Sequence, residues 1–175
     1  GYTNDPGAPG GLSFGYGFIT AYTGTVQHIG CHSFSGWHGF DAARGTTNAF
    51  YDQCVFHKDA YGVSSHEGTW NVRVTGCRFL GGLGVTNRGV DLAVEGCYFA
   101  TRGHAITSVA APERLVVKGN VFDHTGSTDA GVCAVYSDAA AYPTHTREAT
   151  ADPGLSVIED NTIIRAVSAF RYRGL

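Results

Sequence analysis

Apolar and polar residues alternate in short segments along the chain, and glycines interrupt these segments before any of them becomes long. A surface helix would instead place apolar residues three and four positions apart. Alternation over a few residues between turn signals is typical of β-strands. The pattern therefore predicts short strands through most of the chain, the clearest being NVRVTG (71–76), DLAVEG (91–96), RLVVKG (114–119) and LSVIED (155–160).

A Cys or Asn recurs at the end of such segments every 20 to 23 residues, with one longer last step of 41 residues. These positions are Cys31, Cys54, Cys77, Cys97, Asn120 and Asn161. Phe or Ile follows two residues later, except in the first unit, where Phe34 comes three residues after Cys31. The period is too short for a propeller blade, and the signature of leucine-rich repeats is absent. We therefore expect a coil in which each unit makes one winding and strands of successive windings pair in parallel, about 4.8 Å apart.

A second strand recurs in each unit, in which a small residue precedes one apolar residue and polar residues follow. Its copies are GFDAARG (39–45), GVSSHEG (62–68), GVTNRG (84–89), AITSVA (105–110), AVYSDA (134–139) and AFRYRG (169–174). The apolar residue is expected to face the core, so that like residues stack on like residues.

Stacking gives the recurring Cys and Asn a structural role, as an inward-facing column at a corner between two strands. An Asn amide can hydrogen-bond the equivalent residues above and below it, and a small, readily buried Cys fills the same position. We expect the five cysteines to be free thiols, because side chains in such a column run parallel. The sequence has no Cys-x-x-Cys pair and no His-Glu-x-x-His motif, so no zinc site is expected.

The repeated G-[CN]-x-[FY] corner and the G-V-x-x second strand resemble the right-handed parallel β-helix family, the pectate-lyase-like solenoids, over about residues 15–174. The resemblance implies an all-β domain of about six to seven turns at 15–175, after a linker at 1–14. A loop insertion is expected near 138–154, where two prolines and many small residues interrupt the repeat. Members of this family include polysaccharide lyases, glycoside hydrolases, epimerases and bacteriophage tailspikes, whose usual ligand is polysaccharide.

Composition limits the partners. Charged residues are 15% of the chain and the net charge is −3, which gives no reason to expect nucleic acid. No apolar run is long enough to insert into a membrane. The chain contains no Met, and no capping helix is recognisable at either terminus, so we expect a piece of a longer protein whose ends are covered by neighbouring domains or by a homotrimer.

Candidate chemistry follows from stacking the second strands. The residue after the apolar position is expected to point outward, and so is the residue two further on. The first column is Asp41, Ser64, Thr86, Thr107, Tyr136 and Arg171, and the second is Ala43, His66, Arg88, Val109, Asp138 and Arg173. His66 and Arg88 are then neighbours on consecutive windings, with Glu67 beside His66.

These residues suggest a site for acting on polysaccharide. His66 could serve as general acid or base, and Glu67 with Asp138 could supply the two carboxylates of a glycoside hydrolase. Arg88 could pair with a sugar carboxylate. Trp37 and Trp70 could stack on sugar rings, and Tyr61, His104 and Tyr136 could extend the groove. The alternative is that all of them are polar or loop-covering residues that a solenoid must place on its outside.

The leading expectation is a carbohydrate-recognising domain of a bacteriophage tail or tailspike-like protein, located in the virion tail or outside the cell, with cleavage of bacterial surface polysaccharide left open. No metal or other cofactor is expected. The alternatives are a stand-alone polysaccharide lyase, glycoside hydrolase or epimerase, and a structural shaft without activity.

Overall fold

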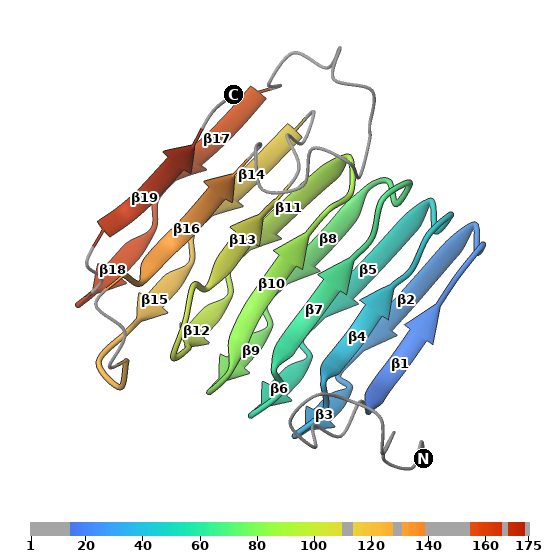
Figure 1. The fold of residues 1–175 in the computed structure, drawn as a ribbon, viewed down its shortest axis with the longest axis horizontal. Helices are drawn as coiled ribbons and strands as arrows, with labels where there is room; N and C mark the ends of the chain where they lie inside the picture. Colours follow the sequence, from blue (N-terminus) through green and yellow to red (C-terminus); the bar gives the residue numbers. More distant parts are fainter. Residues whose placement is uncertain (1–14, 110–113, 128–130, 139–154, 166–167, 174–175) are drawn as a thin grey trace.

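The computed structural model describes residues 15–109, 114–127, 131–138, 155–165 and 168–173. Every regular element in these ranges is a β-strand, and all strand pairs are parallel (Figure 1). Strands of one sheet lie side by side in the order in which the chain forms them. The predicted all-β parallel β-helix is confirmed.

Three sheets form the sides of the coil. Sheet A has seven strands: β1 (Tyr16–Thr20), β4 (His38–Ala42), β7 (Tyr61–Ser65), β10 (Leu83–Asn87), β13 (Ile106–Ser108), β16 (Cys133–Asp138) and β19 (Ser168–Arg173). Sheet B has six: β2 (Thr25–Ile29), β5 (Asn48–Asp52), β8 (Val72–Thr75), β11 (Asp91–Glu95), β14 (Arg114–Lys118) and β17 (Leu155–Glu159). Sheet C has six short strands: β3 (His32–Phe34), β6 (Val55–His57), β9 (Arg78–Leu80), β12 (Tyr98–Ala100), β15 (Val121–Asp123) and β18 (Thr162–Ile164).

The register places equivalent residues of the repeat on top of one another. In sheet A the apolar column is paired as expected, in the order Phe40, Val63, Val85, Ile106, Val135 and Phe170. The first five of these side chains are almost completely buried. Each winding therefore contributes one apolar residue to this column of the core, as the repeat predicted.

The Cys and Asn column is a hydrogen-bonded ladder at the corner between sheets B and C. The Cys97 N–H donates to Asn120 Oδ1 over 2.8 Å, and Asn120 Nδ2 donates to Asn161 Oδ1 over 3.0 Å. In an earlier winding, the Cys54 N–H donates to the sulfur of Cys77 over 3.4 Å. All five cysteines are free thiols, as predicted.

The glycine before this column has a conformational reason. Gly76, Gly96 and Gly119 have φ values of 61°, 62° and 64°, in the left-handed region where a residue without Cβ is least strained. Gln53 and Asp160 adopt the same region with φ values of 53° and 55°. The corner thus requires a left-handed residue in each winding, which explains the recurring Gly of the motif.

A stack of phenylalanines runs along the inside of sheet C. Ring centroids are 4.7 Å apart for Phe56 and Phe79, 4.6 Å for Phe79 and Phe99, and 5.0 Å for Phe99 and Phe122. In the first winding Ser33 pairs with Phe56 and takes the stack position. Phe34, displaced by one residue, is consequently 64% exposed.

Large apolar side chains are exposed mainly in the first and last windings, where a neighbour covers them on one side only; examples are Phe18, Ile29, Leu155, Ile163 and Phe170. Within the described ranges there is no helix of the length and apolarity needed to cross a bilayer. The expected linker at 1–14 and nearly all of the expected insertion, 139–154, lie outside the described residues.

Candidate functional site

Near the start of the sheet A strands two successive residues face the core, which brings together residues that strict alternation would separate. Gly39 and Phe40 both face the core: a Cβ on Gly39 would lie 2.7 Å from the Phe56 ring, and the Phe40 ring is 5.0 Å from the same ring. His38 and Asp41, on either side of this pair, therefore meet on the outer side of the strand. The small residue of the repeat is required here, because Gly62 would place a Cβ 2.5 Å from Phe79 in the same way.

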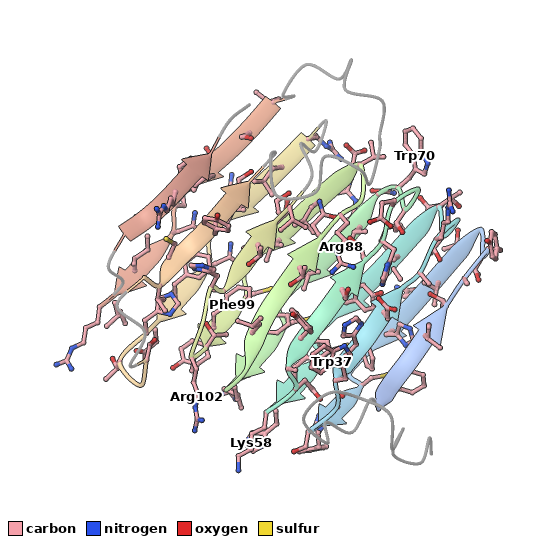
Figure 2. All side chains as sticks on the ribbon, in the orientation of Figure 1. Trp37, Lys58, Trp70, Arg88, Phe99 and Arg102 are labelled. Carbon is pink, nitrogen blue, oxygen red and sulfur yellow. The ribbon has the colours of Figure 1, made fainter. Side chains whose placement is uncertain are left out.

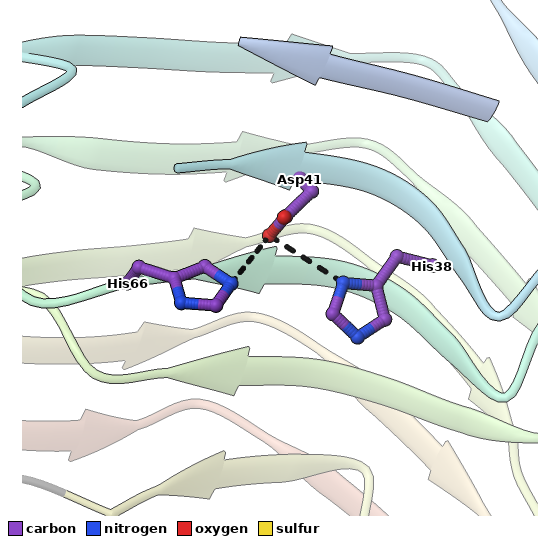
Figure 3. A group of neighbouring side chains, drawn as sticks. All are labelled: His38, Asp41 and His66. Atoms are coloured by element: carbon purple, nitrogen blue, oxygen red, sulfur yellow. Dashed lines mark ion pairs between the residues drawn. The ribbon is translucent and has the colours of Figure 1, made fainter. Parts of the chain in front are cut away.

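His66 joins these two residues from the next winding. It follows β7, and its backbone N–H donates to the Ala42 carbonyl over 3.0 Å, which continues the pairing of β4 with β7. His66 Nε2 lies 3.2 Å from Asp41 Oδ1, and His38 Nδ1 lies 3.5 Å from the same oxygen. Figure 3 shows Asp41 between the two imidazole rings.

The carboxylate of this cluster is buried and one of its imidazoles is accessible. Asp41 is 3% exposed and His38 is 6% exposed, whereas the His66 side chain is 29% exposed. Burial alone raises the pKa of Asp41, but contacts and electrostatic attraction with His38 and His66 outweigh it and lower the pKa to about 2. Asp41 is therefore a carboxylate across the physiological pH range.

Acid should weaken the fold through Asp41. Because the pKa of Asp41 falls from 3.8 to about 2 on folding, the carboxylate stabilises the protein above pH 3.8 and loses this effect as the pH drops toward 2. The full loss corresponds to about 2 kcal/mol. In urea unfolding of chelator-treated protein between pH 5 and pH 2.5, Asp41→Asn should lose less stability than the wild type. Parallel pH profiles for the two proteins would contradict this role of Asp41.

Two aromatic side chains adjoin the cluster. The Trp37 ring stacks on His38 at 6.1 Å with an interplanar angle of 14°, and the Tyr61 ring meets His38 edge-on at 5.1 Å. Trp37 and Tyr61 also contact each other at 5.5 Å. The structure thus joins three residues expected for the site, Trp37, Tyr61 and His66, around His38.

The predicted outer columns exist, but their exposure differs from expectation. Asp41 pairs with Ser64, and Ser64 with Thr86, in the expected register. All three are nevertheless buried. Asp41, expected to be one member of an open column, is instead the covered centre of the cluster.

The other predicted site residues lie on later windings or in the turn after His66. Arg88 follows β10 one winding after His66, and its N–H donates to the Ser65 carbonyl over 3.2 Å. His104 and Tyr136 stack on each other at 4.7 Å, on later windings. Asp138 ends β16, and its Cα lies opposite that of Arg173 in the register of β16 with β19. The partly buried Glu67 follows His66 in the turn after β7, and its role, like that of Asp138, stays a prediction.

Trp70 is separated from Trp37. It is 49% exposed and lies toward the far end of the sheet A strands, whereas Trp37, Lys58 and Arg102 lie toward their beginning (Figure 2). The two tryptophans therefore do not form one platform.

A hollow of about 820 Å³ lies where sheet C turns into sheet A, over four successive windings. Trp37, Lys58, Asp59 and Arg102 are among the residues that line it. Asp59 Oδ1 accepts hydrogen bonds from the Gly36 N–H (2.6 Å) and from the Ser33 hydroxyl (3.1 Å), while burial raises its pKa. Sequence reasoning did not single out Lys58, Asp59 or Arg102, because they lie in the turns between the repeated strands.

The His38–Asp41–His66 cluster can support two kinds of chemistry. A carboxylate that orients an imidazole is a common arrangement for proton transfer. The three side chains also offer ligand atoms that all lie within 4.8 Å of one another, close enough to hold a metal ion. The sequence analysis did not identify His38 as a site residue. The feature that could have identified it is that His38 and Asp41 directly flank the pair Gly39 and Phe40.

Comparison of the chain with protein families, with curated proteins and with solved structures finds no match.

Proposed function

We propose that this chain recognises a polysaccharide in the hollow beside Trp37, as the carbohydrate-facing domain of a bacteriophage tail or tailspike-like protein that acts on bacterial surface polysaccharide. The observation that carries the proposal is the position of Trp37, which lines the hollow and also packs on His38 and Tyr61. An aromatic surface, a recess and a cluster of ionisable groups are therefore continuous.

The chemistry of the hollow suits a sugar polymer. An aromatic ring with one polar edge offers a large contact area to a sugar ring. Lys58 and Arg102 stand two windings apart, which is roughly 10 Å along the coil axis. They could pair with anionic groups on successive sugars. The tail-protein context rests on the resemblance of the repeat to that family, and so do the virion or extracellular location and the homotrimer or neighbouring domains as partners.

Loss of Trp37 should weaken polysaccharide binding. In a panel of bacterial surface polysaccharides, Trp37→Ala should bind the preferred polymer about tenfold or more weakly than the wild type, because it removes the aromatic surface at the centre of the contact. Trp70→Ala is the matched control: it removes the same side chain at the far end of the strands and should bind normally. Equal weakening by both variants would rule out the proposed location, and no binding of any polymer by the wild type would favour a structural shaft.

A second candidate function is cleavage of the bound polymer, which is favoured by the partly exposed His66 beside the buried Asp41 carboxylate. Such a cluster can work by proton transfer through His66 or by a metal ion that activates water. Cleavage would be detected as release of reducing ends or unsaturated uronates. His66→Ala should abolish that release, and the effect of Glu67→Ala tests whether Glu67 takes part.

A further inference from the structure

We propose that His38, Asp41 and His66 form a binding site for one divalent transition-metal ion of the zinc class. The proposal goes beyond polysaccharide recognition, because binding of the ion requires no polysaccharide and can be measured without it.

The distances between the three ligand atoms fit one ion. Zinc binds imidazole nitrogen and carboxylate oxygen at about 2.0–2.2 Å, so that neighbouring ligand atoms around it are roughly 3–3.5 Å apart. Asp41 Oδ1 is 3.2 Å from His66 Nε2 and 3.5 Å from His38 Nδ1. One ligand atom from each of His38, Asp41 and His66 lies within 4.8 Å of the other two. The two distances from Asp41 Oδ1 thus match those between adjacent ligand atoms of one ion.

The buried carboxylate itself points to a missing ligand. Asp41 Oδ1 is inaccessible and has no hydrogen-bond partner by strict geometry, although both imidazoles lie close enough to lower the pKa of its carboxyl. The two imidazole nitrogens approach it at distances longer than the 2.7–2.9 Å of a charge-assisted hydrogen bond. Buried polar atoms are nearly always satisfied by protein, water or an ion. Two nitrogens that approach one buried oxygen at 3.2 Å and 3.5 Å are placed where co-ligands of a shared cation would lie.

The three ligand residues are held by the protein backbone and by packing, and the site is accessible from solvent. His38 and Asp41 belong to β4, and the His66 backbone N–H donates a hydrogen bond to Ala42 of the same strand. Packing against Trp37 and Tyr61 holds the His38 ring. The partial exposure of His66 leaves a coordination position open toward solvent, as in zinc sites that bind water or substrate in addition to three protein ligands.

The ligand set determines the class of ion. Two imidazoles with one carboxylate suit zinc, iron(II) and related transition metals, whereas calcium and magnesium prefer sites made only of oxygen. The sequence gives no zinc motif, because two ligands lie on one winding and the third on the next. Repetition of the coil, and not spacing along the chain, brings them together.

Metal binding can be measured directly on chelator-stripped protein. Calorimetric titration with zinc chloride should give one ion per chain for the wild type, and His66→Ala should bind more than about 100-fold more weakly, since loss of a supporting residue alone costs 10–100-fold. His32→Ala, which removes an exposed histidine from sheet C, is the matched control and should bind like the wild type. Saturating zinc should raise the melting temperature of the wild type and of His32→Ala, but not that of His66→Ala.

Two further measurements test which side chains hold the ion. Cobalt(II) should give visible d–d absorption without a thiolate charge-transfer band, because the ligands are not cysteines. Asp41→Asn keeps the side-chain shape and should lose the ion as well, which provides a second variant if His66→Ala does not fold. No zinc binding by the wild type, a thiolate band, or equal zinc affinity of the wild type and the folded ligand variants would overturn the site. Polysaccharide binding measured in the presence of chelator, compared with Trp37→Ala, tests the proposed function independently of this result.

Discussion

Replacing Phe99 with alanine should lower the free energy of unfolding by about 3–5 kcal/mol. The Phe99 ring is completely buried and stacks between Phe79 and Phe122, at 4.6 Å and 5.0 Å. Its removal leaves a cavity in the middle of a column that the windings on both sides share, and stacked strands cannot easily close it. Chemical denaturation followed by circular dichroism measures the loss.

Phe34→Ala is the control for Phe99→Ala. It removes the same ring from the neighbouring position of an equivalent strand, where the side chain is 64% exposed. A change within about 0.5 kcal/mol is expected for such a surface position. Similar losses of stability in both variants would contradict the assignment of the Phe stack as the core.

Replacing Asn120 with alanine should lower the free energy of unfolding by about 3 kcal/mol, since each buried polar group left without a partner costs about 1–3 kcal/mol. Asn120 Oδ1 accepts the Cys97 N–H, and its Nδ2 donates to the Val94 carbonyl over 3.0 Å and to Asn161 Oδ1. Alanine removes all three bonds and leaves the Cys97 N–H and the Val94 carbonyl without them, whereas Asn161 Oδ1 still accepts the backbone N–H of residue 120. Thermal and chemical unfolding of the two proteins under the same conditions gives the difference.

Asn120→Cys tests whether the ladder positions are equivalent. In an earlier winding the sulfur of Cys77 lies 3.4 Å from the Cys54 N and 3.5 Å from the Tyr51 carbonyl oxygen, so it meets the same two kinds of backbone group. Asn120→Cys should therefore be more stable than Asn120→Ala by about 1 kcal/mol, the net value of a typical hydrogen bond. A cysteine variant no more stable than the alanine variant would show that Cys and Asn are not interchangeable here.

The architecture could be predicted from the sequence because a solenoid repeats its local chemistry. Each winding forms the same corner between sheets B and C. A residue with left-handed φ, a small polar or thiol side chain and a buried ring therefore recur with a fixed period. The exception at Phe34 also has a local cause, because Ser33 takes the stack position in that winding. These features depend on contacts between equivalent residues of successive windings, and such contacts produce a periodic pattern that can be recognised in the sequence.

The candidate site was only partly predictable, because it depends on a departure from the period. Strict alternation places His38 and Asp41 on opposite faces, yet both lie toward His66 because Gly39 and Phe40 between them both face the core. His66 was expected to act with Glu67 and Arg88. Its side-chain contact with Asp41 arises from the reach of the imidazole across to the preceding winding, which a register of Cα atoms does not describe.

The sequence likewise could not predict at which end of the sheet A strands each tryptophan lies. Trp37 and Trp70 both lie near turns, and nothing in their local sequence distinguishes the two ends of a strand. In the structure only Trp37 adjoins the hollow and the His38 ring. The turns that form the hollow vary from one winding to the next, so the repeat carries no signal for them.

Equivalent side chains of successive windings lie directly over one another, and this stacking brings His66 to His38 and Asp41. Nuclear Overhauser contacts between phenylalanine ring protons in selectively labelled protein test it most directly. We expect contacts from Phe56 to Phe79, from Phe79 to Phe99 and from Phe99 to Phe122, and none from Phe56 to Phe122. Missing contacts between these neighbours, or a direct contact between Phe56 and Phe122, would contradict the stacked coil and the site built on it.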